Sequence, residues 1–145
     1  MSPGSLDAGL VRRHLAAIDA AVQQLRSHAG RPLDALRQLD EAWAVERGLQ
    51  VCVQSCIDVA THLAAAAGRD VPDYASAFDR LAQMGALPQD FASSFRAVAG
   101  FRNVLVHGYL EVDLALVHRV LNERLGDFER FARLTAEYLA RAAGP

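Results

Sequence analysis

The longest regular pattern in this chain is an apolar stripe at helical spacing in residues 41–67. Apolar side chains recur there at intervals of four residues, which places them on one face of an α-helix. No proline interrupts the stretch, and Gly68 follows it, at a position where glycine commonly caps a helix. We therefore predict one long helix over this stretch. The residues of the stripe are Val45, Leu49, Val53 and Ile57.

Helical signals dominate the rest of the chain as well. Alanine, leucine and arginine are abundant, and strand-like alternation is scarce. We expect a helix over 7–27, another over 75–84, one from Gln89 into the segment 101–109, and a last helix over 113–141 with Asp113 as its N-cap. The chain is thus predicted to be all-α, an up-and-down bundle of four to five helices. Its 145 residues are the usual size of one domain, so we expect a single domain over 1–145.

Composition bounds what the protein can bind and where it can work. The hydrophobic fraction of 52% is near the average of soluble proteins, and no apolar run approaches the length of a membrane span. Residues 1–10 do not resemble a secretory signal. We therefore expect a cytoplasmic protein that does not contact a membrane. The formal net charge of −2 argues against bulk attraction to nucleic acid, so any RNA contact must be local.

The two cysteines, Cys52 and Cys56, fall on one face of the predicted long helix. Their spacing does not give the opposed geometry of a typical disulfide. Without matching histidines or further cysteines they also make a poor zinc site. We expect buried free thiols, no metal site and no cofactor.

The strongest chemical signal is the segment 101–109, which sets four polar groups inside an apolar run. Arg102, Asn103, His107 and Tyr109 lie within eight residues. Arginine offers a planar charged fork for a phosphate, and histidine suits proton transfer at neutral pH. Together these groups can bind and cleave a phosphodiester. The alternative for such a spacing is a histidine that caps a helix end beside an arginine in a surface ion pair.

Helix geometry limits how Arg102 and His107 can meet. On a straight helix their side chains point about 140° apart, whereas Asn103 and His107 point about 40° apart. Either the helix bends or ends near His107, with Gly108 supplying unusual backbone angles, or a second copy of the motif completes the site. We favour both at once, in a two-fold homodimer whose cleft holds two arginines and two histidines.

The motif Arg102-Asn103-x₃-His107-x-Tyr109 resembles the signature of the HepT-like toxins of the HEPN (higher eukaryotes and prokaryotes nucleotide-binding) superfamily. The similarity covers residues 10–139 and includes four further segments in the family's order. These are Val45-Glu46-Arg47-Gly48-Leu49-Gln50, Cys56-Ile57-Asp58-Val59-Ala60, Pro72-Asp73-Tyr74, and Phe78 to Leu81.

This resemblance implies a HEPN-like helical homodimer with metal-independent endoribonuclease activity and a composite Arg-x₄-His site at the dimer cleft. It also implies a toxin–antitoxin pair. HepT-like proteins are commonly paired with an MntA-like nucleotidyltransferase antitoxin, which neutralises the toxin by transferring AMP to the motif tyrosine, here Tyr109. Some family members cut tRNA.

The residues suggest a division of roles within such a nuclease. RNA carries its own nucleophile, the 2′-hydroxyl, so we expect His107 to transfer a proton and Arg102 to bind the scissile phosphate. Asn103 either orients His107, contacts phosphate or makes a helix-end hydrogen bond. Arg47 and Arg96 are candidates for RNA binding, although surface ion pairs are the commoner role for such arginines.

Two other functions fit the same sequence. One is a nonenzymatic helical binding module that partners a nucleotidyltransferase, and the other is a generic helical dimerisation protein. The intact Arg102, His107 and Tyr109 favour the enzyme over the module, because a scaffold needs no proton-transfer chemistry. Polar groups within the apolar face disfavour a protein that only dimerises.

Overall fold

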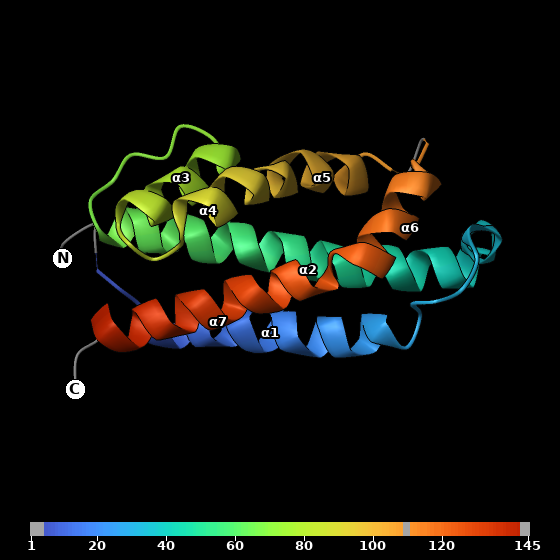
Figure 1. Cartoon of the computed structure of the whole chain (residues 1–145), viewed down its shortest axis with the longest axis horizontal. Helices are drawn as coiled ribbons and strands as arrows, with labels where there is room; N and C mark the ends of the chain where they lie inside the picture. The colour runs from blue at the N-terminus through green and yellow to red at the C-terminus, as the bar shows by residue number, and fades with distance from the viewer. Residues whose placement is uncertain (1–4, 109–110, 143–145) are drawn as a thin grey trace.

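The computed structural model describes residues 5–108 and 111–142, and these parts of the chain contain helices and no strands (Figure 1). The prediction of an all-α protein is therefore confirmed. Seven α-helices and one 3₁₀ helix lie in the described residues. Their bounds are α1 Ala8–Arg26, η1 Leu33–Arg37, α2 Leu39–Ala66, α3 Tyr74–Gln83, α4 Gln89–Phe95, α5 Ala97–Val106, α6 Leu114–Glu123 and α7 Leu125–Ala142.

Helix α2 is the centre of the bundle. Helices α1 and α7 run along one side of it, and α3, α4 and α5 run along the other (Figure 1). Helix α6 crosses at the end of the bundle that lies far from both termini. This arrangement places the segment that carries the motif, α5, directly against the central helix.

The predicted apolar stripe of α2 is confirmed, because all four of its side chains are completely buried. Gly68 follows the helix with a φ of +74°, as expected for a glycine that ends a helix. Among the described helices, only α2 is long and apolar enough to cross a membrane. Since 56% of its most apolar window is buried in the protein, it serves here as a core helix.

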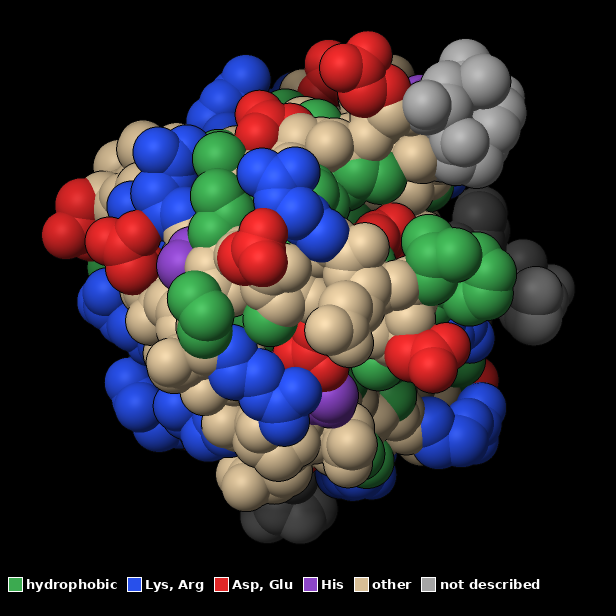
Figure 2. Space-filling model, turned by 90° about the vertical axis from the view of Figure 1, so that its right-hand side faces the viewer, with side chains coloured by type: hydrophobic (Ala, Val, Ile, Leu, Met, Phe, Trp, Pro, Cys, Tyr) green, Lys and Arg blue, Asp and Glu red, His purple; other side chains and the backbone are tan. Residues whose placement is uncertain are grey.

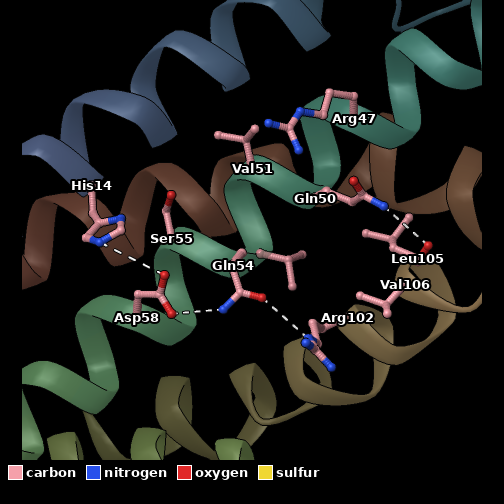
Figure 3. Close-up of a pocket in the computed structure, with 11 residues that line it drawn as sticks. His14, Arg47, Gln50, Val51, Gln54, Ser55, Asp58, Arg102, Leu105 and Val106 are labelled. Carbon is pink, nitrogen blue, oxygen red and sulfur yellow. Dashed lines mark hydrogen bonds and ion pairs between the residues drawn. The ribbon is translucent and has the colours of Figure 1, made fainter.

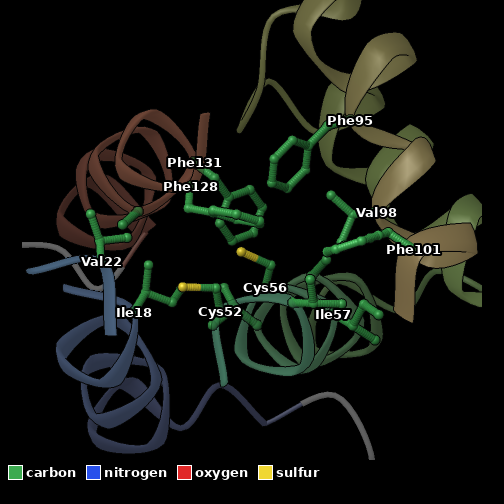
Figure 4. Close-up of a cluster of buried hydrophobic side chains, with 14 of the residues drawn as sticks. Ile18, Val22, Cys52, Cys56, Ile57, Phe95, Val98, Phe101, Phe128 and Phe131 are labelled. Atoms are coloured by element: carbon green, nitrogen blue, oxygen red, sulfur yellow. The ribbon is translucent and has the colours of Figure 1, made fainter. Parts of the chain in front are cut away.

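Aromatic side chains fill the core between α2 and its neighbours (Figure 4). Phe95 lies at the centre of this group, stacked on Phe131 at 5.1 Å and edge-on to Phe78 at 5.1 Å between ring centroids. Offset-stacked and edge-to-face pairs are the favoured geometries of aromatic rings. These contacts join α3, α4 and α7 and hold the end of α4, just before α5, in place.

Two of the predicted helices are each divided in two. The helix predicted from Gln89 breaks at Arg96, where the backbone makes a tighter bond from the Ala99 N–H to the Arg96 carbonyl. The helix predicted over 113–141 breaks at Arg124, whose carbonyl accepts from Asp127 N–H. Buried apolar residues continue at helical spacing across both breaks, because the helices before and after each break turn the same side toward the core. Asp113 caps α6 as expected, accepting from the backbone N–H of Leu116.

Candidate active site

Helix α5 carries the motif and ends within it. Its last residue is Val106, and His107 is the C-cap, with an exposed side chain. The expectation that the helix ends near His107 is therefore confirmed. The side chain of Gln50 on α2 donates to the carbonyl of Leu105 at 3.3 Å, which satisfies one of the carbonyls that a helix end leaves free.

The role expected for Gly108 is wrong. In the described residues, the glycines with positive φ are Gly30, Gly68 and Gly85. Gly108 is instead required by close packing, because a Cβ there would lie 2.6 Å from Cγ2 of Val112 and 3.2 Å from the Val104 carbonyl. The absence of a side chain lets Val112 lie against Gly108 at the end of α5.

Arg102 is half-buried on α5, facing α2 across a groove of about 460 Å³ (Figure 3). Its Nε donates to Oε1 of Gln54 at 3.4 Å, and one terminal nitrogen donates to Oδ1 of Asn103 at 3.4 Å. The guanidinium carbon also lies 5.2 Å from the centre of the Tyr74 ring. Three side chains from three helices thus hold the orientation of the guanidinium while it faces the groove.

A row of polar side chains extends the groove from Arg102 to α1 (Figure 3). Gln54 donates through Nε2 to Asp58 at 2.8 Å, and the other carboxylate oxygen of Asp58 lies 4.0 Å from Nε2 of His14. We did not single out Gln54, Asp58 or His14 as site residues from the sequence. A signal was present, because Gln50, Gln54 and Asp58 recur every four residues on a helix whose other positions are largely apolar.

Glu46 and Arg47, which are adjacent on α2, line two neighbouring grooves. Arg47 is exposed and lines the same groove as Arg102, so its candidacy for RNA binding agrees with its position. Glu46 lines a second groove, of about 730 Å³, and partial burial raises the pKa of its carboxyl. Arg96 lies elsewhere, in an ion pair with Asp79.

No hydrogen bond joins the described side chains of His107 and Arg102 within one chain. His107 is not among the residues that line either groove, and its side chain makes no hydrogen bond or ion pair with the described parts of the protein. Its neighbour Val106 is 40% exposed and borders both grooves. Tyr109 lies outside the described residues. A single chain therefore presents the Arg102 guanidinium and the His107 imidazole separately.

The remaining titratable groups offer little further chemistry. Cys52 and Cys56 are buried free thiols, as expected, and burial raises the pKa of Cys52 to about 12. Burial also raises the pKa of Cys56 well above its ordinary value. Neither is a nucleophile in this state. Within residues 5–108 and 111–142, no group of three or more histidine, cysteine, aspartate or glutamate side chains is arranged to hold a metal ion.

The helical bundle, with the Arg-x₄-His motif at the end of α5, agrees with the expected HEPN-like fold. The sequence profile of the family described as ribonuclease HepT-like matches residues 18–134. The chain therefore belongs to the ribonuclease HepT-like family.

Individual relatives agree with this assignment. The mRNA nuclease HepT of Shewanella oneidensis is 34% identical over 84 residues, an alignment that spans 57% of this chain and 63% of the relative. The match thus covers less than two thirds of that relative. A chain in the structure of the tri-AMPylated HEPN toxin of the same organism, in complex with its MNT antitoxin, superposes with a TM-score of 0.77. That match has 26% identity and covers 88% of this chain and 97% of the other.

A second solved structure has lower sequence identity, so its similarity shows only that the fold is shared. The cytosolic protein of unknown function YutE from Bacillus subtilis superposes with a TM-score of 0.83 at 16% identity, covering 97% of this chain and 95% of YutE. The arrangement of helices is therefore shared well beyond detectable sequence similarity.

Proposed function

We propose that this protein is a metal-independent endoribonuclease toxin that acts in the cytoplasm. The observation that carries the proposal is the guanidinium of Arg102, oriented by Gln54, Asn103 and Tyr74 and facing an open groove, with an exposed His107 at the end of the same helix. Membership of the ribonuclease HepT-like family and the likeness to an mRNA nuclease support it.

RNA cleavage by this route needs one group that transfers protons and one group that binds the phosphate. His107 takes the proton of the 2′-hydroxyl as that oxygen attacks the adjacent phosphorus, or returns a proton to the departing 5′-oxygen. Arg102 binds the phosphate and stabilises the negative charge that builds up in the transition state. The products are a 2′,3′-cyclic phosphate, or its hydrolysed form, and a 5′-hydroxyl. Asn103 accepts from the guanidinium of Arg102 and helps to orient it.

Incubation of the purified protein with mRNA transcripts and with total tRNA in EDTA tests this function. We expect cleavage that persists without metal and leaves cyclic phosphate and 5′-hydroxyl ends. Using both RNAs distinguishes the mRNA specificity of the relative from the tRNA cleavage of other family members. Intact RNA in the presence of a folded dimer would reject the nuclease and favour the nonenzymatic module that partners a nucleotidyltransferase.

A homodimer completes the proposed site. The face that carries α5 also exposes apolar side chains that a monomer would leave in water, with Leu39 and Trp43 each 64% exposed and Val106 40% exposed. All three border the second groove. Exposed apolar clusters of this kind commonly mark protein interfaces. Val106 also borders the groove of Arg102, so a second copy seated here would lie beside that groove.

Replacing Trp43 with glutamate is expected to convert the dimer to a monomer and to lower RNA cleavage in parallel. A charge at the centre of an apolar interface is left without a partner when the interface closes. Ala136→Glu, which adds the same charge at an exposed position on α7, serves as the matched control. Sedimentation and cleavage assays provide the readouts, and a dimeric, fully active Trp43→Glu protein would refute this interface.

Tyr109 is the proposed target of the antitoxin. The similar structure of a tri-AMPylated toxin with MNT antitoxin supports a nucleotidyltransferase partner and AMP as the added group. An adduct at Tyr109 would add bulk and negative phosphate near Arg102 in the sequence and oppose RNA by like charge.

After incubation with ATP and the cognate nucleotidyltransferase, mass spectrometry is expected to find AMP on Tyr109 and a loss of cleavage activity. Tyr109→Phe removes the acceptor hydroxyl with little change in shape, so this variant should remain active and resist neutralisation. Tyr138→Phe is the matched control and should still be neutralised. An adduct found only on another residue would contradict the assignment.

A further inference from the structure

Tyr74 is the only large aromatic side chain that the described part of α3 leaves in water. It is 40% exposed, whereas Phe78, one turn later on the same helix, is completely buried. The first turn of α3, which carries Tyr74, is capped by Asp73, which accepts from the backbone N–H and the hydroxyl of Ser76 at 2.8 and 2.7 Å. These bonds also lower the pKa of Asp73. The ring is therefore exposed on a rigid support.

Tyr74 lies next to the proposed phosphate site. The carbon of the Arg102 guanidinium is 5.2 Å from the ring centre, within the range of a cation–π contact. The contact stabilises the guanidinium, but it leaves two fifths of the tyrosine accessible. The exposed part of Tyr74 takes no part in core packing, and no described residue forms a hydrogen bond with its hydroxyl.

We propose that Tyr74 is a stacking subsite for an unpaired base next to the phosphate that Arg102 binds, and that the enzyme therefore acts on single-stranded RNA. Unpaired bases stack on aromatic rings and arginine planes in single-strand recognition, whatever the base. The ring and the guanidinium are closer together than the length of one nucleotide, so a phosphate on Arg102 places its own or the adjacent base within reach of Tyr74.

Base pairing would prevent this contact. In a duplex each base is covered by its stacked neighbours, so a base can stack on a protein ring only after it leaves the helix. The subsite rests on the proposed nuclease function and adds to it a substrate class. It also assigns a role to an aromatic residue that lies 28 positions before Arg102 in the chain.

A purely structural role for Tyr74 makes a different prediction. If the ring only orients Arg102, its loss would slow cleavage of every RNA by the same factor. If it stacks a base, its loss would matter only for RNA that carries the base. RNA with a single abasic nucleotide beside the cleaved linkage separates these roles.

We expect Tyr74→Leu to lower kcat/KM on single-stranded RNA by about 5- to 150-fold, mainly through KM, because base stacking has an effect of this size. Tyr74→Phe, which keeps the ring, should recover most of the kcat/KM that Tyr74→Leu loses. The abasic substrate should show a similar loss with the parent protein and little additional loss with Tyr74→Leu. Tyr138→Leu is the matched control, since Tyr138 also lies under an arginine, Arg141, but on α7.

If Tyr74→Leu lowered kcat/KM equally on intact and abasic RNA, the stacking subsite would be rejected and Tyr74 would only orient Arg102. An unchanged kcat/KM for Tyr74→Leu would also reject the subsite. Binding separates this proposal from the nuclease function. With 2-aminopurine placed along an uncleaved oligonucleotide, the parent and Tyr74→Phe should quench its fluorescence and Tyr74→Leu should not. Quenching without any cleavage would reject the nuclease but support the subsite, and no quenching by the parent protein would reject the subsite.

Discussion

Replacing His107 with alanine is expected to slow RNA cleavage by about 10² to 10⁴-fold, the usual effect of removing a positioned proton-transfer group. The fold should be unaffected, because His107 is an exposed C-cap whose side chain makes no hydrogen bond with the described residues. Single-turnover rates with saturating enzyme isolate the chemical step from RNA binding. RNA affinity should change much less than the rate.

His118→Ala is the matched control for this experiment. His118 is also a histidine on a helix, but its ring bonds to the carbonyl of Arg31 at 2.9 Å and so supports local structure. Its loss should lower the thermal midpoint and leave the rate of cleavage close to that of the parent. If His107→Ala cut RNA at the parent rate while remaining folded, proton transfer by His107 would be excluded.

Local patterns in the sequence were enough to predict the framework of the protein. The stripe on α2 is buried because its spacing of four residues matches the helix, and the end of α5 at His107 followed from the same helical geometry. The breaks at Arg96 and Arg124 were not predicted, because the spacing of apolar residues does not change when two successive helices pack against one core. Gly108 was misread because a requirement for close packing leaves the same sequence signal as an unusual φ.

The surroundings of Arg102 could not be predicted in the same way. Gln54 and Arg102 are 48 residues apart in sequence and touch only because α2 and α5 pack together. Tyr74 reaches Arg102 from a third helix. The four-residue spacing of Gln50, Gln54 and Asp58 was visible in the sequence, but their contacts depend on which helix packs beside α2. The motif thus supplies the proposed reactive groups, whereas tertiary packing determines how Arg102 is oriented.

Replacing Arg102 with alanine is expected to slow cleavage by about 10² to 10³-fold, because the transition state loses its charge donor. Arg102→Lys should recover only part of this loss. Lysine keeps the charge but cannot bond to Gln54 and a phosphate through one planar fork. Arg130→Lys is the matched control, since Arg130 also lies over an aromatic ring, Phe91 at 4.6 Å, but on α7. Arg102→Ala that cuts RNA at the parent rate would exclude the proposed role.

Mixing the His107→Ala and Arg102→Ala variants tests whether the site is shared between chains. A mixed dimer of Arg102→Ala and His107→Ala subunits keeps one arginine and one histidine, each on a different subunit. Because no hydrogen bond joins these two side chains within one chain, we expect the mixed dimer to regain part of the parent activity, while each variant alone stays slow. Trp43→Glu in both subunits should abolish this recovery. If mixed dimers form without regaining activity, the two groups must act from the same subunit.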